Sequence, residues 1–455
     1  MILRTTLFGN VYNFKDVKEV LAKANEEKSG DRLAGIIANS TEERVAAKVV
    51  LAELTIGDLR NNPVVDYDKD EITRVIQDGV NEKIYNRIKE MTIGEFREFL
   101  LSSNGEEIKE IRDGLTSEVI AGVTKLMSNL DLICASRKLT NIATCNTTIG
   151  MSGTLSARLQ PNHPTDNIEG IIASVMEGIS YGVGDAVIGL NPALDTIDSV
   201  SNILKAFKNF MDRYKIPTQN CVLAHVTTQM EALKKGAPMD LMFQSIAGSE
   251  ISNRSFGIDV KLMDEAYAMM RELKSSKGNN FMYFETGQGS ELSSDGHNGA
   301  DQLTMEARCY GFAKRYNPFL VNTVVGFIGP EYLYDGAQVI RAGLEDHFMG
   351  KLTGLSMGVD VCYTNHMKAD QNDLENLAVL LAQANCNYFM GVPGGDDVML
   401  MYQSSSYHDI AALREVTNKR PIKEFETRLE ELGIMKNGVL ASKAGDSSIF
   451  LGMGV

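Results

Sequence analysis

The sequence predicts an α/β protein built around a (β/α)8 barrel, with a helical extension before the barrel and a short tail after it. From about residue 143, short apolar runs alternate with amphipathic helices. Runs that are apolar on both faces, separated by helices, indicate a parallel sheet covered on both sides. Eight such units in about 270 residues match the strand number and size of a (β/α)8 barrel.

The eight apolar runs are the predicted strands. They cover residues 153–159, 186–190, 221–226, 241–246, 281–284, 319–328, 355–361 and 388–392. The helical period between them is clearest after Asp195, where seven apolar residues from Ile197 to Met211 fall on one face. A doubly wound open sheet is the alternative fold. It would want a G-x-G-x-x-G sequence after its first strand, and this chain has none there.

Residues 1–138 are predicted to form a helical extension used for packing and assembly. One helix is expected between Asp16 and Asn25, with Val17, Val20, Leu21 and Ala24 on its buried face. Residues 40–43 are typical of a capping box, and the helix that they open is expected to run through Val45, Val49, Leu51 and Leu54. Further helices are expected near 70–90 and 117–138. The barrel is expected to span residues 139–420, and a C-terminal helix and tail residues 421–455.

Composition limits the partners of this chain. The net charge of −15 argues against nucleic acid and against a polybasic membrane patch. No stretch approaches the roughly 18 apolar residues that span a bilayer, and the start of the chain lacks the apolar core of a signal peptide. Six scattered cysteines without a C-x-x-C pair are typical of reduced thiols. We therefore expect a cytoplasmic protein with no nucleic-acid or membrane partner.

The candidate active site lies where the predicted strands end, because barrels carry their chemistry at the C-terminal ends of the strands. Glu285 is the most informative position, since a carboxylate that ends a buried strand is costly unless it is paired or used. The polar and apolar side chains at these ends are Arg158, Gln160, Asn191, His225 with Thr227 and Thr228, Ser245, Glu285, Phe327, Asp360 and Met390. Such a set suits a small ligand with a hydroxyl and an ammonium group. Glu285 and Asp360 can hold the cation, and Arg158 and Asn191 can donate to an oxygen.

Other interpretations of these residues stay open. Glu285 and Asp360 could form a structural ion network with Arg158 in a non-catalytic scaffold. Gln160 and Asn191 each precede a proline and could be turn residues. Ser245 and the two threonines fit satisfied hydroxyls, and Phe327 and Met390 fit core positions.

Two reaction types receive little support, because residues or motifs that they commonly use are missing. No lysine stands at a strand end, which disfavours a Schiff base. A divalent metal held by Glu285, Asp360 and His225 is possible, although no H-E-x-x-H spacing supports it. A metal-assisted barrel lyase acting on a small amino alcohol is therefore the alternative function. Residues 394–397 (GGDD) are expected to be a plain loop, because adjacent acids oppose phosphate binding, and His347 is expected at the surface or in a packing contact.

Several long segments resemble the large subunit of ethanolamine ammonia-lyase. They are SARLQP (156–161), GDAVIG (184–189), LAHVTTQ (223–229), FETGQGS (284–290), VGFIGPEYLY (325–334) and AGLEDHFMG (342–350). The similarity begins at TTLFGNVY (5–12) and covers nearly the whole chain. The resemblance implies a lyase that converts ethanolamine to acetaldehyde and ammonia, with adenosylcobalamin supplying the radical chemistry.

The resemblance also implies residue roles. Arg158, Asn191 and Glu285 match residues that bind the substrate hydroxyl, and Gln160, Glu285 and Asp360 match those that bind its amino group. Glu285, Arg158 and Asp360 are thus the expected catalytic residues. The positions near substrate and cofactor are Phe327, Met390 and Leu400, and those on the adenosyl side are Ser245 and Phe256.

Cobalamin is expected to keep its own base on cobalt, so the resemblance offers no protein ligand to the metal, and His347 in particular is not one. The implied partners are a small subunit and a second large subunit, within a trimer of heterodimer pairs. The implied location is the ethanolamine-utilisation microcompartment.

Overall fold

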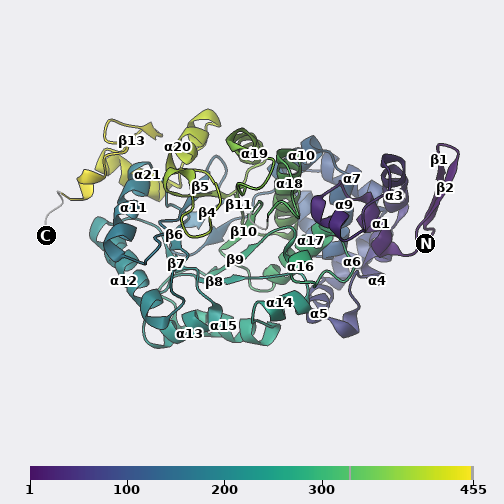
Figure 1. Cartoon of the computed structure of the whole chain (residues 1–455), viewed down its shortest axis with the longest axis horizontal. Coiled ribbons are helices and arrows are strands. Elements are labelled where there is room, and N and C mark those ends of the chain that lie inside the picture. The colour runs from purple at the N-terminus through teal and green to yellow at the C-terminus, as the bar shows by residue number, and fades with distance from the viewer. Residues whose placement is uncertain (327–328, 452–455) are drawn as a thin grey trace.

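The central element is a sheet of eight parallel strands that is nearly closed into a barrel (Figure 1). The computed structural model describes residues 1–326 and 329–451. The barrel strands are β5 (Ser156–Leu159), β6 (Val187–Leu190), β7 (Asn220–Val222), β8 (Met242–Ser245), β9 (Met282–Thr286), β10 (Leu320–Val324), β11 (Met357–Asp360) and β12 (Tyr388–Gly391). Their order is β7-β6-β5-β12-β11-β10-β9-β8. The predicted fold class is confirmed.

The seam between β7 and β8 is joined by fewer backbone hydrogen bonds than the other strand pairs. The backbone N–H of Leu241 donates to the carbonyl of Asn220 at 3.2 Å. Side chains complete the contact, because Asp240 Oδ2 accepts from the Asn220 N–H at 3.1 Å and Asn220 Oδ1 accepts from the Asp240 N–H at 3.0 Å. Each of the eight predicted runs overlaps one of these strands, although β7 begins one residue before its run and β9 ends two residues after its run. The sixth run extends to residues 327 and 328, which lie outside the described residues.

Helices cover the outside of the barrel (Figure 1). They are α11 (Ile168–Ser180), α12 (Ile197–Tyr214), α13 (Val226–Lys234), α15 (Val260–Leu273), α17 (Gln302–Lys314), α18 (Gly336–Thr353), α19 (Gln371–Gln383) and α20 (Tyr407–Val416), with the short α14 (Glu250–Ser255) and α16 (Ser290–Ser293) in loops. In α12 the residues from Val200 to Met211 expected on one face are buried. None of the helices in the described part of the chain is both long and apolar enough to cross a bilayer.

The pleat of each strand decides which side chains reach the barrel interior, because successive residues point to opposite faces. On β9, Phe284 points outward and packs against Tyr316, which follows α17, with ring centroids 5.7 Å apart. Tyr283 and Glu285 therefore point inward. Gly358 of β11 makes room in this interior, since a Cβ there would lie 2.1 Å from the ring of Tyr388.

The N-terminal extension packs on one side of the barrel, and the C-terminal tail lies at the opposite side (Figure 1). The helices of the extension are α1 (Val17–Ala24), α2 (Ser29–Leu33), α3 (Thr41–Glu53), α4 (Ile56–Asn61), α5 (Glu71–Asp78), α6 (Glu82–Ile88), α7 (Ile93–Ser102), α8 (Gly105–Arg112), α9 (Ser117–Lys125) and α10 (Asn129–Lys138). After the barrel come α21 (Lys423–Leu432) and a small hairpin of β13 (Met435–Lys436) and β14 (Val439–Leu440).

A hairpin of β1 (Arg4–Leu7) and β2 (Asn10–Asn13), which the sequence analysis did not predict, precedes these helices and projects from the body (Figure 1). Its two-residue turn places Phe8 at φ 52° and Gly9 at φ 77°. Turns of this kind, with both central residues in the left-handed region, match the twist of antiparallel strands.

Helix α3 differs from the prediction in its N-terminal cap. Ser40 caps it as expected by accepting from the Glu43 N–H at 3.2 Å. The return bond of a capping box is missing, because the Glu43 carboxylate binds Asn39 instead. Val45 and Val49 are 38% exposed, whereas Val50 is buried. These two valines stay partly exposed because α3 packs on α1 and α7 through the face that carries Val50.

Buried ion pairs tie the extension to the barrel helices. Lys28 pairs with Glu345 at 2.8 Å, and Lys125 pairs with Asp301 at 2.9 Å. The guanidinium of Arg308 binds the carboxylates of Asp70 and Glu118, each at 2.8 Å. All of these groups are almost completely buried. Because a buried charge without its partner is strongly unfavourable, these pairs hold the two parts together.

His347 lies in the middle of α18 and is fully buried. Burial, followed by the positive charge of Lys351, lowers its pKa well below the usual histidine value, so its ring is neutral. Of the two positions expected for it, the surface was wrong and the packing contact is confirmed.

Candidate active site

The centre of the candidate site is a buried ion pair that crosses the barrel. Arg158 lies near the end of β5 and Glu285 near the end of β9, two strands that are not neighbours in the sheet order. Nη1 of Arg158 bonds both the Glu285 carboxylate and the Tyr283 hydroxyl. Tyr283 also donates to Oε1 of Glu285 at 2.5 Å. Arg158 is 1% exposed, whereas the Glu285 side chain is 13% exposed, so the carboxylate is the more accessible partner.

The charges of this group are set by burial and by neighbours. Burial disfavours the charge of Arg158, but the oxygens of Tyr283 and Glu285 outweigh that effect and raise its pKa, so the guanidinium stays charged. Burial also raises the pKa of Tyr283 well above its usual value, so its hydroxyl keeps the proton that it donates. The centre therefore holds one fixed cation and a carboxylate whose second oxygen, Oε2, accepts no hydrogen bond from the residues that the structure describes.

Gln160 extends the network from Arg158 toward the loop after β12. Its Oε1 accepts from Nη2 of Arg158, and its Nε2 donates to Oδ2 of Asp397. Asn162 also donates to Asp397 Oδ2, at 2.9 Å. Gln160, Asn162 and Asp397 are all buried.

Asp360 ends β11 and is completely buried. Tyr402 donates to its Oδ2 at 2.7 Å, and the Ser404 hydroxyl donates to its Oδ1. Burial raises the pKa of Asp360 to about 7, against the opposing effect of the bonds from Ser404 and Tyr402. This carboxyl group can therefore gain or lose a proton near neutral pH.

Apolar side chains pack beside Asp360. Met390 and Tyr402 form a small buried cluster with Cys362 and Val392, and Leu400 packs against it. The sulfur of Met390 lies 3.8 Å from the Tyr402 hydroxyl. Met390 and Leu400, both expected near the ligand, are thus brought to one wall of the mouth.

Asn191 and Ser245 lie at the same end of the barrel. Asn162 links Asn191 to the network, because its Oδ1 accepts a hydrogen bond from the Asn191 backbone N–H at 2.8 Å. Ser245 is the strand neighbour of Glu285 in the register of β8 and β9.

Phe256 follows α14, and its carbonyl lies 3.0 Å from Nε2 of His225. The hydrogen bonds of the described residues do not join it to the Arg158 network. Phe327, the remaining expected site residue, lies outside the described residues.

The residues considered for a metal each have other partners. His225 caps α13, with Nδ1 beside Thr227 and Nε2 beside the Phe256 carbonyl. Glu285 is paired with Arg158, and Asp360 accepts two hydroxyl groups. Across residues 1–326 and 329–451, no three His, Cys, Asp or Glu side chains are grouped as metal ligands.

Five residues of the network were not predicted: Asn162, Tyr283, Asp397, Tyr402 and Ser404. Tyr283 could have been found, because it stands two residues before Glu285 and must share its face of the strand. Asp397 lies in the loop expected after β12, but it is 2% exposed and bonded to Gln160, a contact that the sequence analysis did not predict. Tyr402 and Ser404 left no signal in the sequence, because a loop path brings them to Asp360.

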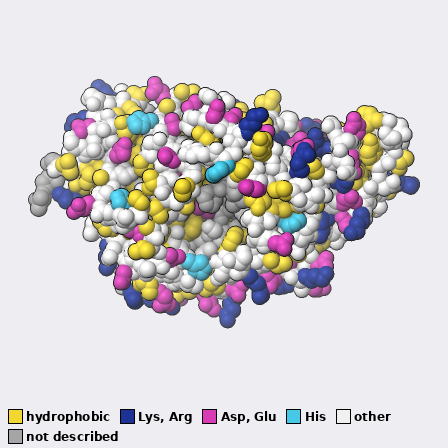
Figure 2. Space-filling model, in the orientation of Figure 1, with side chains coloured by type: hydrophobic (Ala, Val, Ile, Leu, Met, Phe, Trp, Pro, Cys, Tyr) yellow, Lys and Arg dark blue, Asp and Glu magenta, His cyan; other side chains and the backbone are white. Residues whose placement is uncertain are grey.

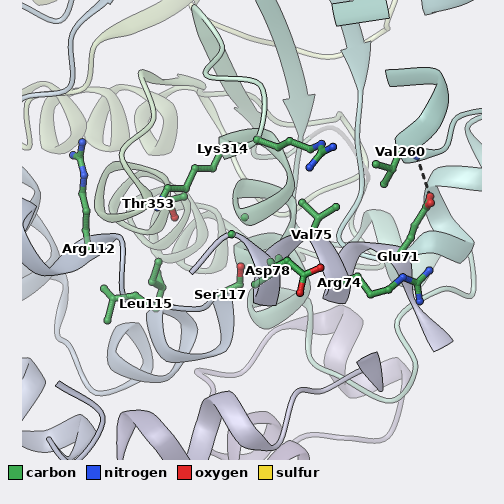
Figure 3. Close-up of a pocket in the computed structure, with 15 residues that line it drawn as sticks. Glu71, Arg74, Val75, Asp78, Arg112, Leu115, Ser117, Val260, Lys314 and Thr353 are labelled. Carbon is green, nitrogen blue, oxygen red and sulfur yellow. Dashed lines mark hydrogen bonds between the residues drawn. The ribbon is translucent and has the colours of Figure 1, made fainter. Parts of the chain in front are cut away.

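A cavity of about 680 Å³ lies elsewhere, between the extension and the outer barrel helices (Figure 3). Two of its cations have partners already. Arg315 is paired with Asp264 at 2.8 Å, and Lys314 with Asp113 at 2.8 Å. The cavity does not include the strand ends, so it is separate from the candidate active site.

The rim of the barrel mouth carries several exposed apolar side chains. Five large exposed side chains stand on loops that leave strand ends, namely Leu194 after β6, Ile251 after β8, Tyr334 after β10, and Val398 and Met401 after β12. Figure 2 shows a hollow over the barrel strands, with hydrophobic side chains around it among histidine and acidic side chains. Exposed apolar groups gathered in this way mark a surface that a ligand or partner covers.

Comparisons with known proteins show the family of this chain. The family model described as "Ethanolamine ammonia lyase large subunit" matches residues 12–443. The ethanolamine ammonia-lyase large subunit of Escherichia coli K12 is 58% identical over 452 residues, which cover 99% of this chain and 100% of the relative. That of Salmonella typhimurium LT2 is also 58% identical with the same coverage. This chain therefore belongs to the ethanolamine ammonia-lyase large-subunit family.

Proposed function

We propose that this chain is the catalytic large subunit of an ethanolamine ammonia-lyase, which converts ethanolamine to acetaldehyde and ammonia with adenosylcobalamin as cofactor. The observation that carries the proposal is the buried Arg158–Glu285 pair, flanked by Gln160 and Asp360. This arrangement offers donors to a hydroxyl oxygen and acceptors to an ammonium group within one enclosed mouth.

At the hydroxyl end, Arg158 and Asn191 donate to the substrate oxygen, and Glu285 accepts a hydrogen bond from the substrate hydroxyl. Arg158 and Tyr283 both bind Oε1 of Glu285, which leaves Oε2 as the acceptor for the substrate. A charged donor and a charged acceptor hold the C–O bond in one orientation, so the carbon that bears the hydroxyl is presented in a fixed position.

At the amino end, Gln160 Oε1, Glu285 and Asp360 accept from the ammonium group. An ammonium beside Asp360 favours its ionised form, so substrate binding draws a carboxyl with a pKa of about 7 toward the charged state. When ammonia leaves, the same carboxyl can hold or return a proton at the departing nitrogen.

The residues around the mouth fit a large cofactor with apolar faces. Ser245, Phe256 and Met390 are the side chains that would hold its adenosyl part. The five exposed apolar side chains of the rim named above would suit a broad macrocycle. When bound, adenosylcobalamin supplies the radical chemistry that activates a substrate C–H bond. The chain contributes binding, orientation and exclusion of water through Met390 and Leu400. His347 is fully buried in α18, which supports the proposal that it would not bind the metal of the cofactor.

The same rim supports a partner. We infer that a small subunit covers part of the mouth, that large subunits pair within a trimer of heterodimer pairs, and that the assembly works in the ethanolamine-utilisation microcompartment. The family itself is described as a large subunit, which supports the existence of a smaller one.

The test is anaerobic turnover of ethanolamine by the chain together with its small subunit, with and without adenosylcobalamin. Acetaldehyde and ammonia formed only with the cofactor are the expected result. Turnover that persists without the cofactor and stops with a chelator would instead support the metal-assisted lyase. No turnover under any of these conditions would refute the proposed function.

A further inference from the structure

We propose that Asp397 is a positioning residue that sets the orientation of the Gln160 amide and thereby the recognition of the substrate ammonium. This inference rests on the proposed function and adds a residue that no strand end carries. Asp397 lies in the loop after β12, is 2% exposed, and belongs to the network described above.

Both oxygens of Asp397 accept hydrogen bonds. Oδ2 accepts from Nε2 of Gln160 and from Nδ2 of Asn162 at 2.9 Å. Oδ1 accepts from the backbone N–H groups of Met399 at 2.9 Å and Leu400 at 2.7 Å, and lies 3.2 Å from Asn162 Nδ2. Only a carboxylate supplies acceptors on both oxygens, since an amide would turn its own N–H groups toward some of these donors.

This geometry decides which end of the Gln160 amide faces the ligand. The amide nitrogen is held by Asp397, and Oε1 is turned toward Nη2 of Arg158. An oxygen with two lone pairs can accept from Arg158 and from an ammonium group at once. A flipped amide would set its own donor against both cations. Asp397 therefore keeps an acceptor at the amino end of the substrate without touching the substrate.

Asp397 also anchors the loop that reaches Asp360. Leu400 is held through its N–H group, and two and four residues later Tyr402 and Ser404 donate to Asp360. Met401, which lies between Leu400 and Tyr402, adopts φ 57°, a left-handed conformation that is uncommon for a residue other than glycine. The anchor thus contributes to holding the apolar wall and the Asp360 donors in place.

The first test is Asp397→Asn, assayed as the complex with the small subunit and adenosylcobalamin. The amide introduced at position 397 is expected to keep its oxygen toward the two backbone N–H groups and to turn its donor toward Gln160, which then flips. We expect kcat/KM for ethanolamine to fall about 10- to 100-fold, as for loss of a hydrogen bond to a charged group. The matched control is Asp396→Asn, a carboxylate one residue away on the same loop that is more exposed. An equal loss in both variants would overturn the proposal.

Two competitive probes separate a positioning role from a general loss of structure. Ethylamine carries only the amino end of the substrate, and ethylene glycol carries only hydroxyl groups. Asp397→Asn is expected to weaken ethylamine inhibition about tenfold or more and to leave ethylene glycol inhibition within about twofold. Equal weakening of both probes contradicts a role directed at the ammonium.

A double variant that is expected to restore activity provides the decisive test. Gln160→Glu alone places two carboxylates in contact and is expected to lose activity. When Asp397→Asn is combined with Gln160→Glu, the carboxylate at position 160 accepts both from the new amide at position 397 and from Arg158. The kcat/KM of this double variant should therefore exceed that of either single variant by at least about tenfold.

Additive losses in the double variant would overturn the inference, even if Asp397→Asn alone assembles poorly. With normal wild-type turnover, these failures refute only the role of Asp397. Absent wild-type turnover refutes the proposed function and this inference together.

Discussion

Glu285→Gln tests the centre of the site, because the substitution keeps the shape of the side chain and removes its charge. The amide oxygen can still accept from Arg158 and Tyr283, so the guanidinium is not left without a partner. We therefore expect the free energy of unfolding to fall by about 1.5–3 kcal/mol, the range for a hydrogen bond to a charged group, rather than the roughly 3–5 kcal/mol of a broken buried pair.

The loss of catalysis is expected to be much larger than the loss of stability. Glu285 is proposed to accept from both the hydroxyl and the ammonium of the substrate, and each charge-assisted bond contributes about 1.5–3 kcal/mol. The sum, about 3–6 kcal/mol, corresponds to a fall in kcat/KM of roughly 10²- to 10⁴-fold. The assay is ethanolamine turnover at saturating cofactor, with cofactor affinity measured by absorbance titration.

The control is Glu265→Gln, which removes an exposed carboxylate on α15 that lies 3.9 Å from Lys261. Exposed pairs of this kind contribute about 0–1 kcal/mol, so turnover and melting should hardly change. A Glu285→Gln variant whose kcat/KM stays within about threefold of wild type would refute the assignment of this carboxylate to the substrate.

Three further predictions concern charge and packing. The pKa of Asp360 is raised from 3.8 to about 7, so the folded state holds the extra proton and the contribution of this group to stability falls as pH rises between these values. Asp360→Asn should remove this part of the pH dependence of stability in melts from about pH 5 to 8. An unchanged pH dependence would contradict the prediction. Arg308→Met should leave the buried carboxylates of Asp70 and Glu118 unpaired and lower the free energy of unfolding in urea by about 3–5 kcal/mol. The control, Lys261→Ala at an exposed position, should lower it by less than about 0.5 kcal/mol. Equal effects of the two variants would mean that the buried pairs contribute little to stability. Gly358→Ala should set a methyl 2.1 Å from the Tyr388 ring and cost about 1–3 kcal/mol or more in the same assay; a neutral result would show that the ring can move.

The barrel could be predicted from the sequence because its evidence lies within each element. A strand covered on both faces is apolar throughout, and a helix that covers it repeats its apolar residues every three to four positions, as α12 does. The fold then predicts a site at the strand ends, so Arg158, Gln160, Glu285 and Asp360 could be grouped although far apart in the chain.

Features that depend on neighbours could not be predicted in this way. Val45 and Val49 fit a buried helical face, but the position of α1 and α7 decides which face of α3 is covered. The hairpin at residues 4–13 is too short to carry a strong alternating pattern. His347 stands in a helix that is buried almost all round, where a polar residue gives no sign of its depth.

The sequence by itself determined the eight-stranded barrel and the residue types at its mouth, because hydrophobic period and strand ends are local properties. Only the tertiary structure decided that Arg158 pairs with Glu285 across the barrel, that Tyr402 and Ser404 bond Asp360, and that Asp397 holds Gln160. Those contacts join residues as many as 237 positions apart. They depend on the path of a loop and the exact placement of side chains, which no periodic pattern records.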